Sequence, residues 1–166
     1  MDAIFKRRSI RQYTDDPVSP EQVKQILEAG MCAPSAGNER PWHFIVVSDK
    51  EKLVKISQMS EYARMTCAAQ LAIIVCGDVS LEIHKGMWVQ DCSATTENML
   101  LQIESVGLGS VWLGVHPISE REEFIREMFN LEPNIIPFSV LPIGHKGVEK
   151  ECHCRYDESR VHYERW

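Results

Sequence analysis

Residues 71–77 read Leu-Ala-Ile-Ile-Val-Cys-Gly, an unbroken apolar run that ends at a glycine. Strands buried on both faces carry such runs, whereas a strand with one wet face alternates apolar and polar residues. A run of this length is too short to cross a bilayer and is typical of a buried strand. We therefore predict a central strand over 71–77.

Three further strands are predicted around this one. The run Phe-Ile-Val-Val at 44–47 favours a pleated, buried surface, so a strand is expected over 42–48. Two more are expected over 110–115 and over 138–143, the last ending at Gly144.

Helices are predicted between the strands. Two of them begin with capping-box patterns, Ser19-Pro20-Glu21-Gln22 and Ser119-Glu120-Arg121-Glu122, and Gly30 is the expected stop of the first. The longest has small residues at 93–96, where close packing is expected. The expected helices cover 2–8, 20–30, 50–58, 61–69, 88–106 and 119–129. The fold class is therefore α+β, a three-layer α-β-α domain.

Length and composition limit the class of protein. The 166 residues suit one domain over 1–166, and 44% hydrophobic with 25% charged residues is the ordinary globular mixture. Eighteen Lys and Arg against 24 Asp and Glu give a formal charge of −6, which argues against general nucleic-acid binding. No apolar run approaches a membrane span, and residues 1–6 lack a signal-type apolar core. A soluble, cytoplasmic protein is expected.

Cysteines cluster only at Cys152-His153-Cys154. Zinc sites show wider paired spacings, so a structural or incidental role is favoured over a metal site. The other four cysteines lie in apolar or helical surroundings, where a free thiol behaves as a small hydrophobe. No metal ligand is therefore assigned.

The densest positive charge is Arg7-Arg8-Ser9-Ile10-Arg11. If the first helix continues, Arg7 and Arg11 share a face at i, i+4, and Ser9 adds a hydroxyl. Two guanidinium forks with a hydroxyl suit a phosphate monoester. The same arginines could instead complement the negative end of the first helix. Both interpretations stay open at this point.

Two loops could border a ligand. Residues 33–42 are rich in proline and small residues, which leave a thin surface for a planar ring, and Asn38 offers donors and acceptors. Taken alone, this loop is better explained as a helix-to-strand turn. Residues 107–114 are glycine-rich but lack the GxGxxG order, so they indicate close backbone approach to a neighbour or a ligand.

The chain end is polar yet carries Val161, Tyr163 and Trp166. Burying a large apolar side chain contributes roughly 1.5–3 kcal/mol, so a terminal tryptophan is expected to dock. Its own domain and a partner subunit are equally good candidates. No nucleophile elbow, HExxH or P-loop motif is present, and no catalytic side chain is assigned.

Five motifs in this order resemble the flavin-dependent nitroreductase superfamily, in particular its short FMN-binding members. The resemblance extends over nearly the whole chain. The motifs are 7–11, then 33–35 with Asn38 and 41–44, then 90–91 with 97–98, then 107–114, and the tail 155–162 with Trp166.

The resemblance implies a central, mostly antiparallel sheet flanked by helices and an interwoven homodimer with two FMN molecules at its interface. The tail 150–166 would pack on the partner subunit. Arg7, Arg8, Ser9 and Arg11, joined by Arg155, would hold the phosphate and ribityl chain. Pro34, Ser35 and Ala36 of the partner, with Asn38 nearby, would border the isoalloxazine. Trp112, Leu113 and Gly114 would approach its reactive edge, and Gly144 with its neighbours would complete the pocket.

The implied activity is an FMN-dependent NAD(P)H oxidoreductase. NADH or NADPH would reduce the flavin and depart, and a nitroaromatic, quinone or similar small acceptor would then take two electrons in a ping-pong cycle. FMN supplies this chemistry, and the protein orients it. Two alternatives are a flavin-binding protein without turnover, such as a sensor or carrier, and a thiol- or metal-responsive module at Cys152-His153-Cys154.

Overall fold

The structure, a computed structural model, describes residues 2–151 and 155–166. The helices are α1 (Asp2–Lys6), α2 (Pro20–Met31), α3 (Lys50–Ile56), α4 (Trp88–Ser105) and α5 (Ser119–Phe129). The strands are β1 (Trp42–Val47), β2 (Leu71–Asp78), β3 (Leu108–Ser110), β4 (Leu113–Gly114) and β5 (Ile135–His145). Short 3-10 turns are η1 (Ala36–Asn38), η2 (Glu61–Ala68), η3 (Val79–Leu81) and η4 (Glu158–Arg160).

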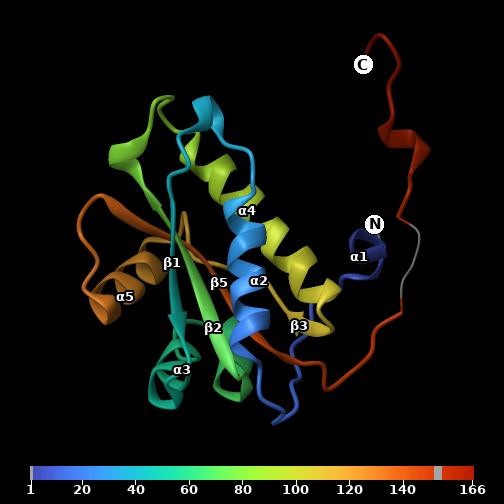
Figure 1. The fold of residues 1–166 in the computed structure, drawn as a ribbon. Coiled ribbons are helices and arrows are strands. Elements are labelled where there is room, and N and C mark those ends of the chain that lie inside the picture. Colours follow the sequence, from blue (N-terminus) through green and yellow to red (C-terminus); the bar gives the residue numbers. More distant parts are fainter. Residues whose placement is uncertain (1, 152–154) are drawn as a thin grey trace.

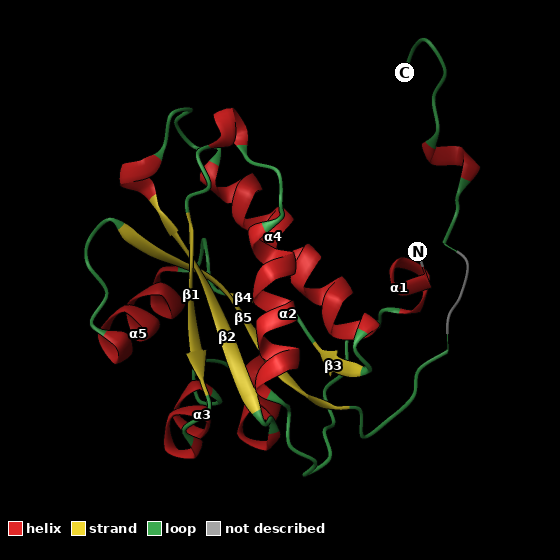
Figure 2. Ribbon diagram, viewed as in Figure 1, coloured by secondary structure: helices red, strands yellow, loops and turns green. Residues whose placement is uncertain are grey.

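The strands form a five-stranded sheet in the order β1-β2-β5-β3, with β4 also paired to β5. All strand pairs in it are antiparallel. β2 and β5 form the middle, and β1 lies at one edge (Figures 1 and 2). Residues 71–77 of β2 are buried throughout, which confirms the predicted central strand.

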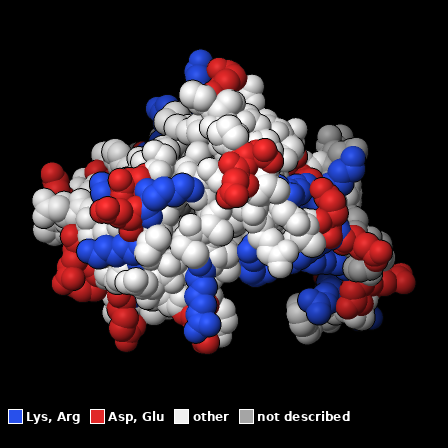
Figure 3. All heavy atoms as spheres, turned by 90° about the horizontal axis from the view of Figure 1, so that it is seen from below, with Lys and Arg blue, Asp and Glu red and all other residues white. Residues whose placement is uncertain are grey.

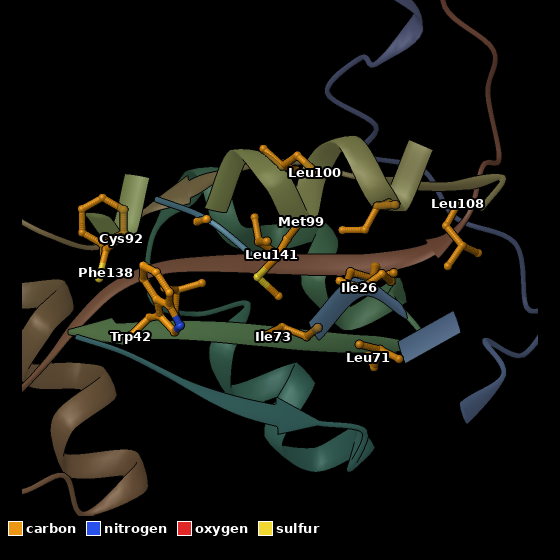
Figure 4. Packing of buried hydrophobic residues seen from close by; sticks show 14 of the residues in the cluster. Ile26, Trp42, Leu71, Ile73, Cys92, Met99, Leu100, Leu108, Phe138 and Leu141 are labelled. Atoms are coloured by element: carbon orange, nitrogen blue, oxygen red, sulfur yellow. The ribbon is translucent and has the colours of Figure 1, made fainter. Parts of the chain in front are cut away.

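The side chains of β2 divide the core into two halves. Leu71, Ile73 and Val75 join the cluster under α2 and α4, whereas Ala72, Ile74 and Cys76 join the cluster that α3 and α5 cover. This division follows because successive side chains of a strand point to opposite faces of the sheet. Figure 4 shows the first cluster, with Leu100 and Met99 of α4 above Leu141 of β5. The three-layer α-β-α arrangement is confirmed.

The expected contact with the small residues of the long helix is provided by α2. The Thr95 hydroxyl donates to the carbonyl oxygen of Gly30 at 2.7 Å, and the Asn98 amide donates to that of Ala29 at 3.1 Å. A Cβ on Gly30 would lie 2.9 Å from Met99 Cγ. Gly30 is therefore a close-packing position, and α2 continues one residue past the predicted stop.

Three predicted elements were wrong in detail. Residues 61–68 form a 3-10 turn instead of an α-helix, and β5 begins at Ile135, earlier than predicted. The expected strand over 110–115 is divided into β3 and β4. Their common register places Val111 opposite Pro142, which has no N–H for the ladder. The missing donor explains the interruption.

One of the two predicted capping boxes is formed. Ser19 accepts a hydrogen bond from the backbone N–H of Gln22, and the Gln22 side chain accepts one from Ser19, as predicted. The second box was wrong, because Ile118 is the N-cap of α5 and no side chain caps this end. Glu122, its expected partner, instead contacts Nδ1 of His116 at 2.7 Å.

The first helix ends at Lys6, so Arg7 and Arg11 do not share a helical face. Beyond it the chain runs beside the sheet: the Ile10 N–H donates to Ser110 at 2.9 Å, and the Thr14 N–H donates to His145 at 3.1 Å. These hydrogen bonds to β3 and β5 require an extended backbone. Pairing with the sheet therefore replaced the predicted second turn of helix.

Candidate functional site

The arginine segment and the glycine-rich segment lie side by side. Ser9 and Ser110 form a parallel bridge, and a Cβ on Gly109 would lie only 2.8 Å from Ile10 Cγ2. The close backbone approach expected at 107–114 is thus made at Gly109 by a neighbouring segment of the same chain. This contact fixes where the arginines leave the sheet edge.

A cavity of about 420 Å³ lies next to this edge. It brings together four residues singled out from the sequence: Arg11, Trp112, Leu113 and Gly114. Its other lining residues, which the sequence analysis did not single out, are Ser60, Glu61, Tyr62, Met65, Val111 and Arg121. The cavity thus joins the segment before α2, the turn η2, the interruption between β3 and β4, and the start of α5.

Arg121 binds the backbone at the cavity wall. Its guanidinium donates to the carbonyl oxygen of Gly114 at 2.8 Å. The sequence did carry one signal for it, because a cation in the first turn of a helix opposes the helix dipole. Residues 60–65 carried no such signal, since 61–65 were predicted only as part of a helix over 61–69.

The backbone at Gly114 borders open space. A Cβ added there would meet no heavy atom within 4 Å. Next to it, Trp112 packs edge-on against Phe138, with ring centroids 5.7 Å apart. Aromatic packing of this kind restrains the indole. A planar ligand could therefore lie against a rigid wall of backbone at 112–114.

Basic side chains gather around the arginine segment. The Arg8 guanidinium donates to the backbone oxygen of Glu151 at 2.9 Å, and Lys150 donates to that of Ser9 at 2.8 Å. Arg8 also lines a small cavity of about 110 Å³ with Lys146. Figure 3 shows Lys and Arg side chains gathered on the right of the face seen from below, with acidic groups beside them. This clustering favours an anionic ligand.

Not every arginine is equally available. Arg7 lies 3.4 Å from Glu97 of α4, and Lys146 lies 2.7 Å from Glu104 of the same helix. Arg11 donates weakly to the backbone oxygen of Ser9 at 3.5 Å, is exposed, and lines the 420 Å³ cavity. Arg11 is therefore the arginine that the structure brings directly to the 112–114 wall.

The loop at 33–40 lies elsewhere, between α2 and β1. None of Pro34, Ser35, Ala36 and Asn38 lines the 420 Å³ cavity. The loop is a tight turn: Gly37, Asn38 and Arg40 have left-handed φ values of 55°, 58° and 45°. The interpretation as a helix-to-strand turn is confirmed, and Pro34 and Asn38 are exposed on it.

Two carboxyl groups are buried beneath this loop. Asp91 is 4% exposed and Glu39 is 9% exposed. Asp91 Oδ1 accepts the N–H of Ala36 at 3.0 Å. Glu39 Oε2 accepts the N–H groups of Ile83 and His84 at 2.6 and 3.1 Å. Asp91 was noted from the sequence only as part of the motif 90–91, and Glu39 was missed.

The two acids have opposite pKa shifts. Burial, reinforced by the adjacent Glu39, raises the pKa of Asp91 above its usual range. Burial acts on Glu39 in the same direction, but the hydrogen bonds from the amides of His84 and Ile83 outweigh it and lower the Glu39 pKa. The two shifts favour Asp91 over Glu39 as the acid that holds a proton when the pair carries one.

Gly144 and Arg155, the other predicted residues, do not line the 420 Å³ cavity. Gly144 is buried on β5, where a Cβ would lie 3.1 Å from Tyr13 Cβ. Burial raises the pKa of Tyr13, whose hydroxyl donates to backbone oxygens of Ile10 and Pro142. Arg155 begins an exposed arm that extends away from the body of the molecule (Figure 1). Trp166 at its end is fully exposed and lies 4.4 Å from the His162 ring.

The described residues contain neither a candidate membrane span nor a candidate metal-binding group. Within 2–151 and 155–166, no helix is long and apolar enough to cross a membrane. The same residues contain no group of three or more His, Cys, Asp or Glu side chains placed to hold a metal ion. The candidate cluster Cys152-His153-Cys154 lies outside the described residues.

Known proteins resemble this chain in sequence and in fold. The sequence model of the nitroreductase family matches residues 4–70 and 65–145. A protein of Methanothermobacter thermautotrophicus named "Putative NADH dehydrogenase/NAD(P)H nitroreductase" is 48% identical over 166 residues, covering 100% of this chain and 87% of that protein. The structure of an FMN-dependent nitroreductase from Clostridium difficile R20291 is 32% identical with a TM-score of 0.92, covering 99% of this chain and 98% of that one. A structure from Desulfovibrio desulfuricans, described as "a putative nitroreductase in complex with fmn", is 30% identical with a TM-score of 0.86, covering 99% of this chain and 96% of that one. By its sequence and its fold, the chain belongs to the nitroreductase family.

Proposed function

We propose that this chain binds FMN at the 420 Å³ cavity and is an NAD(P)H-dependent oxidoreductase acting on a small acceptor such as a nitroaromatic or a quinone. The observation that carries the proposal is the meeting of Arg11 with the open backbone wall at 112–114. One of the similar structures is named FMN-dependent and another is described with FMN.

The residues present fit this cofactor. Binding cavities for ligands of drug size span roughly 300–1,000 Å³, and this one is about 420 Å³. The open side of Gly114 leaves room for a flat ring against the backbone. Guanidinium groups make strong, charge-assisted hydrogen bonds to phosphate. Arg7, Arg8, Ser9 and Arg11 would hold the phosphate and ribityl chain, and Trp112, Leu113 and Gly114 would border the ring, whereas Gly144 and Arg155 do not line this cavity.

A second subunit would complete the site. Pro34, Ser35, Ala36 and Asn38 lie outside this chain's own cavity, and a homodimer would bring the partner's copies to it. Exposed apolar groups support such an assembly: Phe5 on α1 is 69% exposed, and Trp166 on the arm is 100% exposed. We propose that the arm 150–166 packs on the partner subunit of a single-domain protomer.

FMN would supply the transfer of two electrons from NADH or NADPH to the acceptor, with donor and acceptor using the open side of the cavity in turn. The chain's own residues would bind and orient. Arg11 and Arg121 place two positive charges at the cavity, and fixed positive charge stabilises negative charge that develops there. No side chain is proposed as a nucleophile or as a general acid.

The test is an absorption spectrum of the protein after FMN is added and removed by desalting, for wild type, Arg11→Gln and Lys24→Gln. Lys24 is an exposed cation on α2 paired with Glu28, so its variant controls for loss of charge alone. We expect wild type and Lys24→Gln to retain flavin and Arg11→Gln to lose at least part of it. Colourless wild-type protein would refute the proposal.

Turnover is tested by anaerobic mixing of the flavin-loaded protein with NADH or NADPH. Bleaching, followed by recovery of the flavin colour on adding a quinone or a nitroaromatic, is the expected result. Parallel lines in double-reciprocal plots of rate against donor at several acceptor concentrations would support the alternating cycle. Flavin that stays oxidised with both donors would favour a sensor or carrier.

A further inference from the structure

The buried pair Glu39 and Asp91 has no role in the proposed electron transfer. Two oxygen atoms of the pair, Glu39 Oε1 and Asp91 Oδ2, are buried and have no hydrogen-bond donor. The two side chains nevertheless lie within hydrogen-bonding reach of each other. The opposite oxygens are already used, by Ala36 on the Asp91 side and by Ile83 and His84 on the Glu39 side.

A single proton between the two carboxyl groups resolves this arrangement. Two ionised carboxylates cannot donate to each other, and a buried acceptor left without a donor destabilises the fold, the more so when it is charged. One proton gives Oε1 and Oδ2 a common hydrogen bond and leaves one negative charge on the pair. The amides of Ile83 and His84 then stabilise that remaining charge on Glu39.

The pair connects three segments that are distant in the sequence. Asp91 belongs to the first turn of α4 and holds the amide of Ala36. Glu39 lies at the end of the loop 34–39 and holds the amides at 83 and 84, before α4. Repulsion between two ionised acids would push Glu39, at the end of the loop, away from Asp91, which holds Ala36, and would therefore displace the loop that carries Pro34, Ser35 and Asn38.

We propose that Glu39 and Asp91 share one proton, and that this proton holds the loop 34–38 in the position in which it borders FMN of the partner subunit. Glu39 and Asp91 are thus positioning residues, because they act through the loop and touch no reacting atom. The inference rests on the proposed function, in which this loop completes the flavin site.

The direction of the pH effect follows from the groups around the pair. His84 and Glu82 on the segment before α4 act on it in opposite senses: His84 lowers the Glu39 pKa, and Glu82 raises that of Asp91. Cys92, the next residue on α4, has a buried thiol, and burial raises the pKa of that thiol, so it stays neutral. Raising the pH removes the shared proton and leaves two adjacent buried negative charges. FMN affinity should therefore fall on the alkaline side.

Isosteric variants separate the proton from the packing. In Asp91→Asn and in Glu39→Gln, an amide N–H replaces the shared proton and cannot be lost in the accessible pH range. FMN affinity is measured by flavin fluorescence titration from mildly acidic to alkaline pH for both variants, for wild type and for Glu28→Gln. Glu28 is an exposed carboxylate on α2 and serves as the matched control.

The shared proton itself is read without FMN. A protonated carboxyl group gives an infrared C=O band that an ionised one lacks. We expect this band in the wild-type minus Asp91→Asn difference spectrum of the flavin-free protein at neutral pH. We expect this band to disappear in the same alkaline pH range in which wild-type FMN affinity falls. That fall should be about tenfold or more, which corresponds to a change of one unit in the pKa of the pair when FMN binds.

The outcomes are distinct. A band that titrates together with a wild-type affinity loss, and a flat affinity profile in the two amide variants, would support the inference. Absence of the band at neutral pH would overturn it. A band accompanied by the same pH profile of affinity in wild type and Asp91→Asn would overturn the positioning role. If wild type binds no FMN at any pH, the proposed function fails and the positioning role fails with it, while the band still decides the shared proton.

Discussion

Gly109 and Gly114 offer a paired test of how the sheet edge supports the cavity. In Gly109→Ala the new Cβ would lie 2.8 Å from Ile10 Cγ2, 2.9 Å from Ile10 Cβ and 3.0 Å from Lys146 Cγ. Ile10 is 1% exposed and cannot swing into solvent. The substitution should therefore push the segment 9–11 away from β3, along with Arg11.

The size of the effect follows from overpacking. Forcing a methyl group into a filled space costs roughly 1–3 kcal/mol of folding free energy. The bridge between Ser9 and Ser110 and the hydrogen bond from Ile10 to Ser110 would also be strained. We expect Gly109→Ala to lose about 1–3 kcal/mol of unfolding free energy and to bind FMN more weakly.

Gly114→Ala is the matched comparison. Its Cβ would meet no heavy atom within 4 Å, so the unfolding free energy should change by less than about 0.5 kcal/mol. The methyl group would project into the open space beside the proposed flavin site, and FMN affinity should fall.

The assay is urea denaturation followed by tryptophan fluorescence, with flavin fluorescence titration of the same preparations. The predicted pattern is stability loss with binding loss for Gly109→Ala, and binding loss alone for Gly114→Ala. Equal stability of Gly109→Ala and wild type would refute the argument that Ile10 is held tightly against β3. Unchanged FMN affinity in Gly114→Ala would refute the placement of FMN at the 112–114 wall.

Three further predictions concern the stability of the fold. Ser19→Ala removes the cap of α2 and should lower the free energy of unfolding by about 1 kcal/mol. Ser119→Ala should change the urea midpoint little, because the Ser119 side chain caps no helix. Equal losses of stability in the two variants would contradict the cap assignment. Met99 of α4 is fully buried, and Met99→Ala should lower the free energy of unfolding by about 2–5 kcal/mol in the same denaturation assay. A loss below about 1 kcal/mol would mean that neighbouring side chains collapse into the space that the substitution leaves. Burial raises the pKa of Asp78, but hydrogen bonds from Ser80 and Asn134 outweigh it and hold that pKa below its ordinary value of 3.8. The ionised Asp78 carboxylate therefore stabilises the fold fully above pH 3.8, and this stabilisation is lost as the pH falls through the lower pKa that Asp78 has in the folded protein. Asn134→Ala should thus be less stable than wild type at neutral pH, and the difference in stability should shrink in acid.

Much of the fold follows from local patterns. The apolar run at 71–77 had to be a strand covered on both faces, because no other short element buries every side chain of such a run. The capping box at Ser19 and the small residues at 93–96 also predicted their surroundings correctly. The second capping box failed because Ser119 and Glu122 fit the pattern locally while His116 took the Glu122 side chain.

The site was predicted less completely. The sequence motifs named Arg11 and 112–114, and the tertiary structure placed them at one cavity. Arg121 was missed because its only signal was an unfavourable position relative to the helix dipole. Glu39 was missed because a carboxylate in a polar turn resembles any exposed acid until its burial is known.

Local patterns were enough to predict which faces are apolar, where helices begin and which family the motifs resemble, since each depends on residues close together in the chain. The contacts of Ile10 with Gly109, of Arg121 with Gly114 and of Glu39 with Asp91 became known from the folded chain alone. Hydrophobic periodicity specifies whether a residue is buried, but it does not specify the neighbour that buries it. Those neighbours come from chain segments that meet only when the two cores form on either side of the sheet.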